Sequence, residues 1–356
     1  MVKFSKYLKR LGIVAGVAFL LLVTHRAAPR KAVENEQMKG VWLTNIGTIL
    51  LHHTTSLDEV LNHLSRSGYD RVYFSVYGLR GTLYPTSQRP TNWLFVPPLS
   101  NPWRAAVKES LRQGLKPFAW FEYGLMLSPK DPIAKKHPDW LLKTPAGKTV
   151  VETNVWLDPA NPQVQAYLLG NMEDILKEKD LAGIQLDDHW AVPRVFGNKS
   201  QALTNLTRKL HDHVKAINPK LVVSLSPNPH SFAVNKYNQN WLAWVRQGIV
   251  DEVVLQIYRK TPNQVAASLS GSGLATASRY VPVGVGLYAG WNPDFSLKGL
   301  QAQVRTVERQ GYGYSLFCWE FVVMRHLFNH RKFGSETPPF YGGFAVKYEH
   351  RLRNMC

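Results

Sequence analysis

Cysteine is scarce in this sequence: two of its 356 residues are cysteines, Cys318 and Cys356. Two thiols cannot build the disulfide framework of a small secreted domain, and neither has a Cys or His neighbour at the spacing that zinc sites use. We therefore expect no metal site. Cys318 lies in an apolar run from Tyr314 to Trp319, which favours a buried, unreactive thiol.

The sequence has fewer acidic than basic residues. The sequence has 43 Lys and Arg against 25 Asp and Glu, a formal net charge of +18. Such an excess suits nucleic acid, an anionic membrane surface or an acidic envelope polymer. Part of the excess lies before residue 32, and the rest is scattered among carboxylates without a continuous basic helix or zinc-finger spacing. Nucleic acid is therefore not the expected partner.

The N-terminal apolar run is too short for a comfortable membrane span. Leu11–Val23 has 13 residues, whereas a transmembrane helix needs roughly 20. The run follows the basic segment Lys3–Arg10, an order typical of a secretory signal. Pro29 disfavours cleavage after the preceding alanines, so residues 11–23 are expected to act as a signal peptide or a membrane anchor. We expect residues 1–37 to form this segment and a polar tether, and the protein to be exported to the periplasm or beyond.

From Lys39 onward, short β-branched or aromatic runs alternate with amphipathic stretches of helical length, which predicts a parallel sheet with crossover helices. The expected strands are Gly40–Asn45, Arg71–Tyr77, Lys116–Tyr123, Ala182–Asp188, Leu221–Pro227, Glu252–Tyr258, Val281–Tyr288 and Tyr312–Glu320. Eight such strands predict a closed (β/α)₈ TIM barrel over residues 38–329, followed by a C-terminal extension, residues 330–356. A doubly wound sheet is the alternative, but no glycine-rich dinucleotide motif follows any strand, and no cofactor is expected.

The crossover helices and long loops can also be located. Each helix shows one apolar face, as in the sets Leu57, Val60, Leu61, Leu64; Val164, Tyr167, Leu168, Met172; and Leu203, Leu206, Leu210, Val214. The glycines expected to end helices are Gly68, Gly114, Gly248 and Gly311. Two long segments, 79–102 and 125–162, follow the second and third strands, where loops of a barrel shape the substrate site.

The fourth predicted strand ends in the segment Gly183–Trp190, which contains two adjacent aspartates. Because side chains alternate along a strand, Gln185 and Asp187 are expected to face the barrel interior, while the residues beside them face the helices. An N-cap role for Asp187 is disfavoured because the next helix is expected only near Ser200. Asp187 is therefore the best-placed catalytic carboxylate in the sequence.

The same alternation brings two further carboxylates to this mouth. Glu122 ends the third predicted strand and Glu320 ends the eighth. Glycosidic bond cleavage needs such a set, because one carboxylate attacks or stabilises the sugar while a second, with a raised pKa, protonates the departing oxygen. For Glu122 and Glu320 a structural salt bridge is the alternative interpretation.

Aromatic residues gather at the predicted strand ends, where the apolar faces of sugar rings would stack on them, although aromatics also fill barrel layers. These residues are Trp42, Tyr77, Trp120, Trp190, Tyr258, Tyr288, Trp291 and Trp319. Four polar residues complete the expected substrate-binding set: Asp188, His189, Asn228 and Gln256. His189 is also placed to modulate the pKa of the neighbouring acids.

A series of short motifs resembles one family in order and spacing. The motifs are Gly40-Val-Trp-Leu-Thr44, Val72-Tyr-Phe-Ser-Val76 with Leu83-Tyr-Pro85, Ala119-Trp-Phe121, His137-Pro-Asp-Trp140, Trp156-Leu-Asp-Pro159, Gly183-Ile-Gln-Leu-Asp-Asp188, Ser226-Pro227, Gln256-Ile-Tyr258 and Gly284-Val-Gly-Leu-Tyr288. Between Lys39 and Phe321 the chain resembles the glycosyl-hydrolase-like family 10 group of bacterial envelope proteins. The resemblance implies a TIM barrel and activity on bacterial polysaccharide, in some members on the glycan strands of peptidoglycan.

The resemblance also implies that the double Asp after the fourth strand is the functional centre. By looser analogy, alpha-amylase-type barrels carry a nucleophilic Asp two residues after an inward polar residue, as Asp187 follows Gln185, which favours Asp187 over Asp188 as nucleophile. This sequence departs from the family pattern at four positions: Glu122 replaces a common Asn, Gln185 a His, Tyr77 an Arg and His189 an aromatic. The acid/base therefore stays open between Glu122 and Glu320.

Three functions are compatible with the sequence. The first is a glycoside hydrolase that cleaves an envelope or extracellular polysaccharide with two carboxylates, about 5 to 5.5 Å apart for retention or about 6.5 to 9.5 Å apart for inversion. The second is a non-catalytic glycan-binding barrel. The third, a metal-dependent polysaccharide deacetylase, needs His ligands near the Asp pair, where the sequence offers His189.

Overall fold

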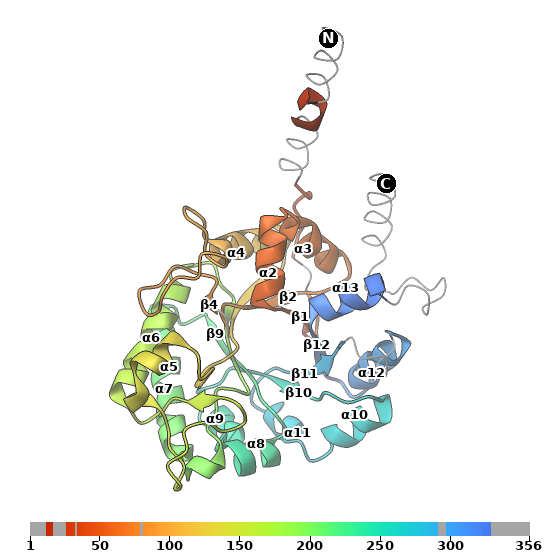
Figure 1. Cartoon of the computed structure of the whole chain (residues 1–356). Coiled ribbons are helices and arrows are strands. Elements are labelled where there is room, and N and C mark those ends of the chain that lie inside the picture. Colours follow the sequence, from red (N-terminus) through yellow and green to blue (C-terminus); the bar gives the residue numbers. More distant parts are fainter. Residues whose placement is uncertain (1–11, 17–25, 33, 79–80, 291–296, 329–356) are drawn as a thin grey trace.

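The computed structural model describes residues 12–16, 26–32, 34–78, 81–290 and 297–328. At its centre, eight parallel strands form a closed barrel (Figure 1). In barrel order the strands are β1 Lys39–Leu43, β12 Gly313–Phe317, β11 Val283–Tyr288, β10 Glu252–Gln256, β9 Val222–Ser226, β8 Gly183–Asp187, β5 Lys116–Phe121 and β2 Arg71–Ser75. Because β1 pairs with both β2 and β12, the ring is closed, and the predicted TIM barrel is confirmed.

Helices surround the barrel in Figure 1. They are α2 Asn45–His53, α3 Leu57–Arg66, α4 Pro102–Arg112, α5 Pro132–Lys136, α6 Pro162–Leu176, α7 Ser200–Ile217, α8 His230–Tyr237, α9 Trp241–Arg246, α10 Pro262–Leu269, α11 Leu274–Ala277, α12 Leu297–Arg309 and α13 Trp319–Phe328, with 3-10 turns η1 Pro138–Trp140 and η2 Arg194–Phe196. The apolar faces predicted for α3, α6 and α7 are buried against the barrel.

The four glycines predicted to end helices do so. Each lies two residues beyond the end of α3, α4, α9 or α12 and has a positive φ: 84° at Gly68, 72° at Gly114, 67° at Gly248 and 80° at Gly311. A residue with a Cβ is strained in this left-handed conformation, so glycine lets the chain leave the helix and turn back toward the next strand.

Two separate sets of apolar side chains fill the barrel and its outer layer. The interior set is Met38, Trp42, Tyr73, Phe118, Trp120, Val254 and Cys318. Ile184 and Leu186 pack instead in the outer layer. Gln185 points inward, where it accepts a hydrogen bond from the indole of Trp42 (Nε1 to Oε1, 2.6 Å). The alternation predicted along the fourth strand is therefore confirmed.

A buried polar network closes the N-terminal end of the barrel. Arg71, at the start of β2, donates hydrogen bonds to Asp70 and Glu252. Glu252 also accepts from the hydroxyl groups of Tyr73 (3.0 Å) and Ser224 (2.9 Å). Buried charges are tolerated when paired and hydrogen-bonded in this way. The network therefore connects β2, β9 and β10 across the barrel, at the end opposite the predicted site.

The long segments after β2 and β5 lie at the C-terminal face of the barrel, as predicted. The first includes the short antiparallel pair β3 Tyr77–Gly78 and β4 Gly81–Thr82. The second includes the pair β6 Met126–Leu127 and β7 Val155–Trp156, with α5 and η1 between its strands.

The described part of the expected N-terminal tether packs along α3 and α4 instead of extending freely. The amide of Ala27 donates to Asp58 (2.6 Å) and the amide of Arg30 donates to the carbonyl of Arg112 (2.9 Å). Of the expected signal or anchor, residues 12–16 are helical and the rest lies outside the described residues, as does the extension 330–356. In the described part of the chain, no helix is both long and apolar enough to cross a membrane.

Candidate active site

Asp187 is the last residue of β8, and its carboxylate is enclosed at the mouth of the barrel. The residue is 4% exposed. Its Oδ1 accepts a hydrogen bond of 2.7 Å from Gln256 at the end of β10. Gln239 fixes the backbone on the same turn, because its side-chain amide donates to the carbonyls of Asp187 (3.3 Å) and Trp190 (3.0 Å). The side chain of Asp187 is therefore held from β10, two strands away, and its backbone is held from the segment between α8 and α9.

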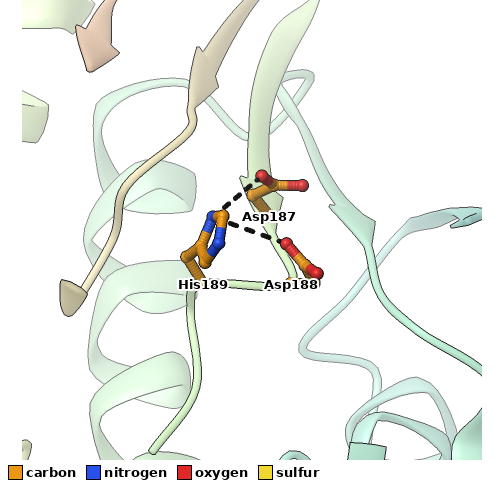
Figure 2. A group of neighbouring side chains, drawn as sticks. All are labelled: Asp187, Asp188 and His189. Carbon is orange, nitrogen blue, oxygen red and sulfur yellow. Dashed lines mark ion pairs between the residues drawn. The ribbon is translucent and has the colours of Figure 1, made fainter. Parts of the chain in front are cut away.

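The next two residues complete an acidic cluster with a histidine at its centre (Figure 2). Figure 2 shows the imidazole of His189 facing both carboxylates; its Nδ1 lies 3.4 Å from Asp187 Oδ2 and 3.5 Å from Asp188 Oδ1. Asn228, after β9, donates to Asp188 Oδ2 (2.8 Å). Tyr123 stacks on the imidazole with ring centres 5.5 Å apart. The cluster thus carries two carboxylates and one candidate counter-ion.

Electrostatics set the protonation of this cluster. Burial, reinforced by the neighbouring Asp188 carboxylate, raises the pKa of Asp187 to about 7. Burial alone would lower the pKa of His189, but the carboxylates of Asp188 and Asp187 raise it to about 10. His189 is therefore a cation at neutral pH, and its charge favours the ionised form of Asp187 beside it.

Glu122 stands next to Asp187 across the barrel wall. Trp120 pairs with Gln185, and Phe121 pairs with Leu186, so Glu122, the first residue after β5, stands opposite Asp187, the last residue of β8. The strand predicted to run to Tyr123 therefore ends one residue before Glu122. Neighbouring strands are about 4.8 Å apart, which places the two inward side chains side by side. Ser75, at the end of β2, donates to Glu122 Oε2 (2.5 Å).

The environment of Glu122 suits a proton donor. Burial raises its pKa to about 7, although the hydrogen bond from Ser75 and the charge of His189 oppose the rise. A carboxyl with this pKa still holds a proton near neutral pH, which a general acid requires. No Lys or Arg contacts Glu122 among the described residues, so the alternative salt bridge is not formed there.

The placement of Glu320 differs from the prediction. β12 ends at Phe317, and Glu320 lies in the first turn of α13 instead of on the strand. Its Oε1 accepts from the amide (2.8 Å) and hydroxyl (2.9 Å) of Thr44, the N-cap residue of α2. An acidic residue is favoured in the first turn of a helix because of the helix dipole, which the strand pattern could not reveal. Burial raises the pKa of Glu320.

The carboxyl of Glu320 nevertheless reaches the same mouth from the opposite side of the ring. Its charge contributes to the raised pKa of Glu122. Cys318 is fully buried as expected, and burial raises the pKa of its thiol well above the usual value. The three predicted carboxylates therefore converge, but Glu320 is bound to the start of α2, whereas Glu122 bonds to a single serine.

Five of the expected sugar-stacking residues are buried and require correction. Trp42 and Trp120 fill the barrel interior beneath the acids, with exposures of 1% and 2%. Three more pack in the outer layer. The hydroxyl of Tyr77 bonds to Tyr167 (3.0 Å), the indole of Trp190 donates to Thr207 (2.9 Å), and Trp319 belongs to the helix-side core. Trp291 lies outside the described residues.

Tyr258 and Tyr288 remain at the mouth, joined by two residues that the sequence pattern did not single out. Tyr258 stacks on Phe317 with ring centres 5.6 Å apart, and Phe321 packs edge-on against Tyr288 at 5.7 Å. These four rings are half-buried and follow β10, β11 and β12, so they form an aromatic wall beside the acids. The alternation of side chains along β12 was a signal from which the position of Phe317 could have been predicted. Phe321 lies on α13, where that alternation does not apply.

The amide side chains bind the acids instead of standing free for a substrate. Gln256 Nε2 bonds to Asp187 and to the carbonyl and hydroxyl of Ser226, and Asn228 Nδ2 bonds to Asp188. Both were expected to hold sugar hydroxyls. The structure assigns their donors to positioning the carboxylates, because an ionised acid is the stronger acceptor.

Asp187, Asp188 and His189 also form a group whose ligand atoms lie within 4.8 Å of one another, a spacing compatible with a metal ion. The ring geometry opposes this use. His189 Nδ1 lies 3.1 Å from the backbone carbonyl of Glu122, and a carbonyl oxygen only accepts hydrogen bonds. Nδ1 therefore carries a proton and has no lone pair for a metal, so in this arrangement the imidazole acts as a counter-ion.

A closed (β/α)₈ barrel with converging carboxylates and aromatic rings at its C-terminal face is the arrangement typical of glycoside hydrolases. The chain belongs to the glycosyl hydrolase-like 10 family, which matches residues 37–208 and 198–294. Glycosyl hydrolase DigH from Escherichia coli strain K12 is 22% identical to this chain in an alignment of 331 positions. The alignment covers 70% of this chain and 75% of DigH. DigH from Shigella flexneri is similar to the same extent.

Solved structures share the fold. The glycoside hydrolase domain of PgaB (BpsB) from Bordetella bronchiseptica superposes with a TM-score of 0.63 at 13% identity, covering 81% of this chain and 95% of that domain. The GH36 alpha-galactosidase AgaA from Geobacillus stearothermophilus gives a TM-score of 0.52 at 13% identity, covering 84% of this chain and 42% of that protein. Family and fold together support a glycan-acting hydrolase.

Proposed function

We propose that this protein is a retaining glycoside hydrolase that cleaves a bacterial envelope polysaccharide, with peptidoglycan glycan strands as the first candidate. Asp187 is the nucleophile and Glu122 is the acid/base. The observation that carries the proposal is that Glu122 and Asp187 stand opposite each other where the neighbouring strands β5 and β8 end, both with a pKa near 7. Retaining enzymes use two carboxyls about 5 to 5.5 Å apart, so the proposal requires the Asp187 and Glu122 carboxyls to approach each other to this distance.

In the first step, the ionised Asp187 attacks the anomeric carbon and forms an ester, while Glu122 gives its proton to the departing glycosidic oxygen. In the second step, Glu122 accepts a proton from water, whose oxygen attacks the same carbon and releases Asp187. The His189 cation keeps Asp187 ionised, and Gln256 fixes its Oδ1. Both steps balance without a cofactor.

The proposals about the substrate and the cellular location are supported by other features of the sequence and the site. The basic segment Lys3–Arg10 and the apolar run Leu11–Val23 support export, with retention at the membrane as an anchor or release after cleavage. The net charge of +18 favours an acidic polymer of the cell envelope over a neutral one. Half-buried rings at the mouth supply flat surfaces for sugar rings.

The test is a panel of purified glycans, including peptide-free peptidoglycan strands and α-glucans, incubated with the wild type and Asp187→Asn. Asp187→Asn is expected to lower turnover by about a thousandfold or more. Because burial raises the pKa of Asp187 above its unfolded value, ionisation of this group weakens folding as pH rises, so the neutral Asn is expected to keep the melting temperature at pH 8.

Asp212→Asn serves as the control, since its carboxylate is 66% exposed on α7 and pairs with His211. It is expected to keep full turnover. A barrel that binds a glycan of the panel but cleaves none would show a binding function without catalysis. Undiminished turnover in Asp187→Asn would remove Asp187 from the chemistry.

A further inference from the structure

A groove of about 620 Å³ opens among the loops that follow β8 and β9, at the same face of the barrel as the acids. Its lining comes from three loops or loop-borne helices: Val151 and Glu152 before β7; Pro193, Arg194 and Val195 at η2; and Ser231, Phe232, Asn235 and Lys236 on α8. We call this surface the distal groove. None of its lining residues takes part in the chemistry proposed above.

The distal groove is lined by residues that lie close in sequence to the acidic cluster. Pro193 follows the Asp187–Trp190 turn by three residues, and Ser231 follows Asn228, which binds Asp188, by the same number. Glu152 lies close enough to sense His189: burial raises the pKa of Glu152, but bonds from Lys236 and Tyr237 and the charge of His189 lower it. The loops after β8 and β9 therefore carry both the acidic cluster and the lining of this groove.

Hydrogen bonds hold the walls of the distal groove in place. Lys236 Nζ lies 2.9 Å from Glu152 Oε1, and the hydroxyl of Tyr237 donates to Glu152 Oε2 (2.8 Å), which joins α8 to the loop before β7. The side chain of Asn238 donates to the carbonyls of Val192 (3.0 Å) and Gly197 (3.0 Å), which joins α8 to the loop carrying η2. The groove is therefore formed before any ligand arrives.

The surface chemistry suits a sugar ring. Phe232 is 45% exposed and Val195 is 50% exposed, so a flat apolar surface faces solvent inside a concave site. Lys236 and Arg194 border this surface with hydrogen-bond donors; the Lys236 ammonium lies 5.5 Å from the Phe232 ring centre. Sugars combine apolar C–H faces, which stack on aromatics, with hydroxyl groups that accept from such donors.

We propose that the distal groove binds further sugar units of the polysaccharide chain whose scissile bond lies over Asp187, with Phe232 as the stacking platform. This inference rests on the proposed function and deepens it: the enzyme acts within long chains and selects them over short fragments. Because Lys236 pairs with Glu152, Arg194 gives the lining one net positive charge, which further favours a glycan that carries carboxylates.

The experiment compares kcat/KM on long strands and on tetrasaccharide fragments of the panel polymer that the wild type cleaves fastest. The wild type is expected to prefer long strands. Phe232→Ala is expected to lose about tenfold on long strands and far less on tetrasaccharides, because only the long chain reaches the groove. Phe232→Tyr keeps the ring and is expected to restore the preference. Tyr280→Ala, which removes a 58% exposed ring outside the groove, is the matched control.

Equal losses on both lengths in Phe232→Ala, or no loss on either, would overturn the inference. A loss that Phe232→Tyr does not restore, together with a lowered melting temperature, would assign Phe232 a structural role and also overturn it. Failure of the proposed function is separate, because Asp187→Asn would then retain turnover on every chain length, or the wild type would cleave no glycan of the panel.

Discussion

At the scale of single residues, protonation distinguishes the three carboxylates at the barrel mouth. Asp187 and Glu122 share a pKa near 7, so in one productive state the first is ionised while the second keeps its proton. His189, with a pKa of about 10, stays charged throughout this range. Its position 3.4 Å from Asp187 favours the ionised form of that carboxylate.

This protonation state predicts a bell-shaped dependence of kcat/KM on pH with its maximum near 7. The rate rises as Asp187 loses its proton and falls as Glu122 loses its own, because the nucleophile must be ionised and the acid protonated. Glu122→Gln is expected to abolish the alkaline limb and to lower the rate by about a hundredfold to ten-thousandfold. The measurement is kcat/KM from pH 5 to 9 on the best-cleaved polymer.

Glu320→Gln is the matched control for this profile. Its carboxylate is bound by Thr44 at the start of α2, so the variant is expected to keep both limbs of the curve. The opposite pattern, with the alkaline limb kept in Glu122→Gln and lost in Glu320→Gln, would transfer the acid/base role to Glu320.

Residue-level prediction from sequence succeeded where alternation along a strand decides the direction of a side chain. Gln185 and Asp187 point inward as the pattern of β8 required. The pattern says nothing of depth, however. Tyr77 and Trp190 follow strand ends as a groove residue would, yet tertiary packing buries both behind the barrel wall. Partners such as Ser75 depend on three-dimensional neighbours.

At the scale of secondary-structure elements, the strands could be predicted but their ends could not, because five of the predicted strands run two or three residues past the observed end. All eight predicted strands exist, because short β-branched runs between amphipathic helices have few other solutions. The eighth was extended too far: Cys318–Glu320 continues the apolar run of β12, but the chain turns there into α13. A short apolar run fits strand and helix equally well, so its periodicity cannot locate such a boundary.

The N-terminal ends of the strands stabilise the barrel, whereas their C-terminal ends carry the acids. We therefore expect a substitution at the N-terminal end to lower stability without changing catalysis. Glu252 begins β10 and binds Arg71 and Tyr73 at the closed end of the barrel. Glu252→Ala leaves Arg71 buried with Asp70 alone and is expected to cost about 3 kcal/mol, measured by urea unfolding. The kcat of the folded fraction is expected to stay unchanged, because the acids lie at the opposite end.

Glu308→Ala is the control for this experiment. Glu308 pairs with Lys39 at 3.2 Å on the surface, where its side chain is 37% exposed, and its loss is expected to cost less than about 1 kcal/mol. A large fall in kcat with unchanged stability in Glu252→Ala would contradict this division between the two ends of the barrel.

At the scale of the whole molecule, the barrel makes one site from residues far apart in sequence. Glu122, Asp187 and Glu320 come from β5, β8 and α13, and the ring closure between β1 and β12 brings the last of them to the others. The sequence could predict this convergence because parallel strands of a closed barrel end at one face. The distal groove was not predictable, since it depends on how three loops pack.

The central claim is that Asp187 is the nucleophile and Glu122 the acid/base of a retaining mechanism, in which the two carboxyls stand about 5 to 5.5 Å apart and leave no room for a water molecule between carboxylate and sugar. Proton NMR of the first product released by the wild type tests it most directly, because the anomeric signal reports the configuration before mutarotation. The account predicts a product with the same anomeric configuration as the substrate. A product of inverted configuration would contradict it.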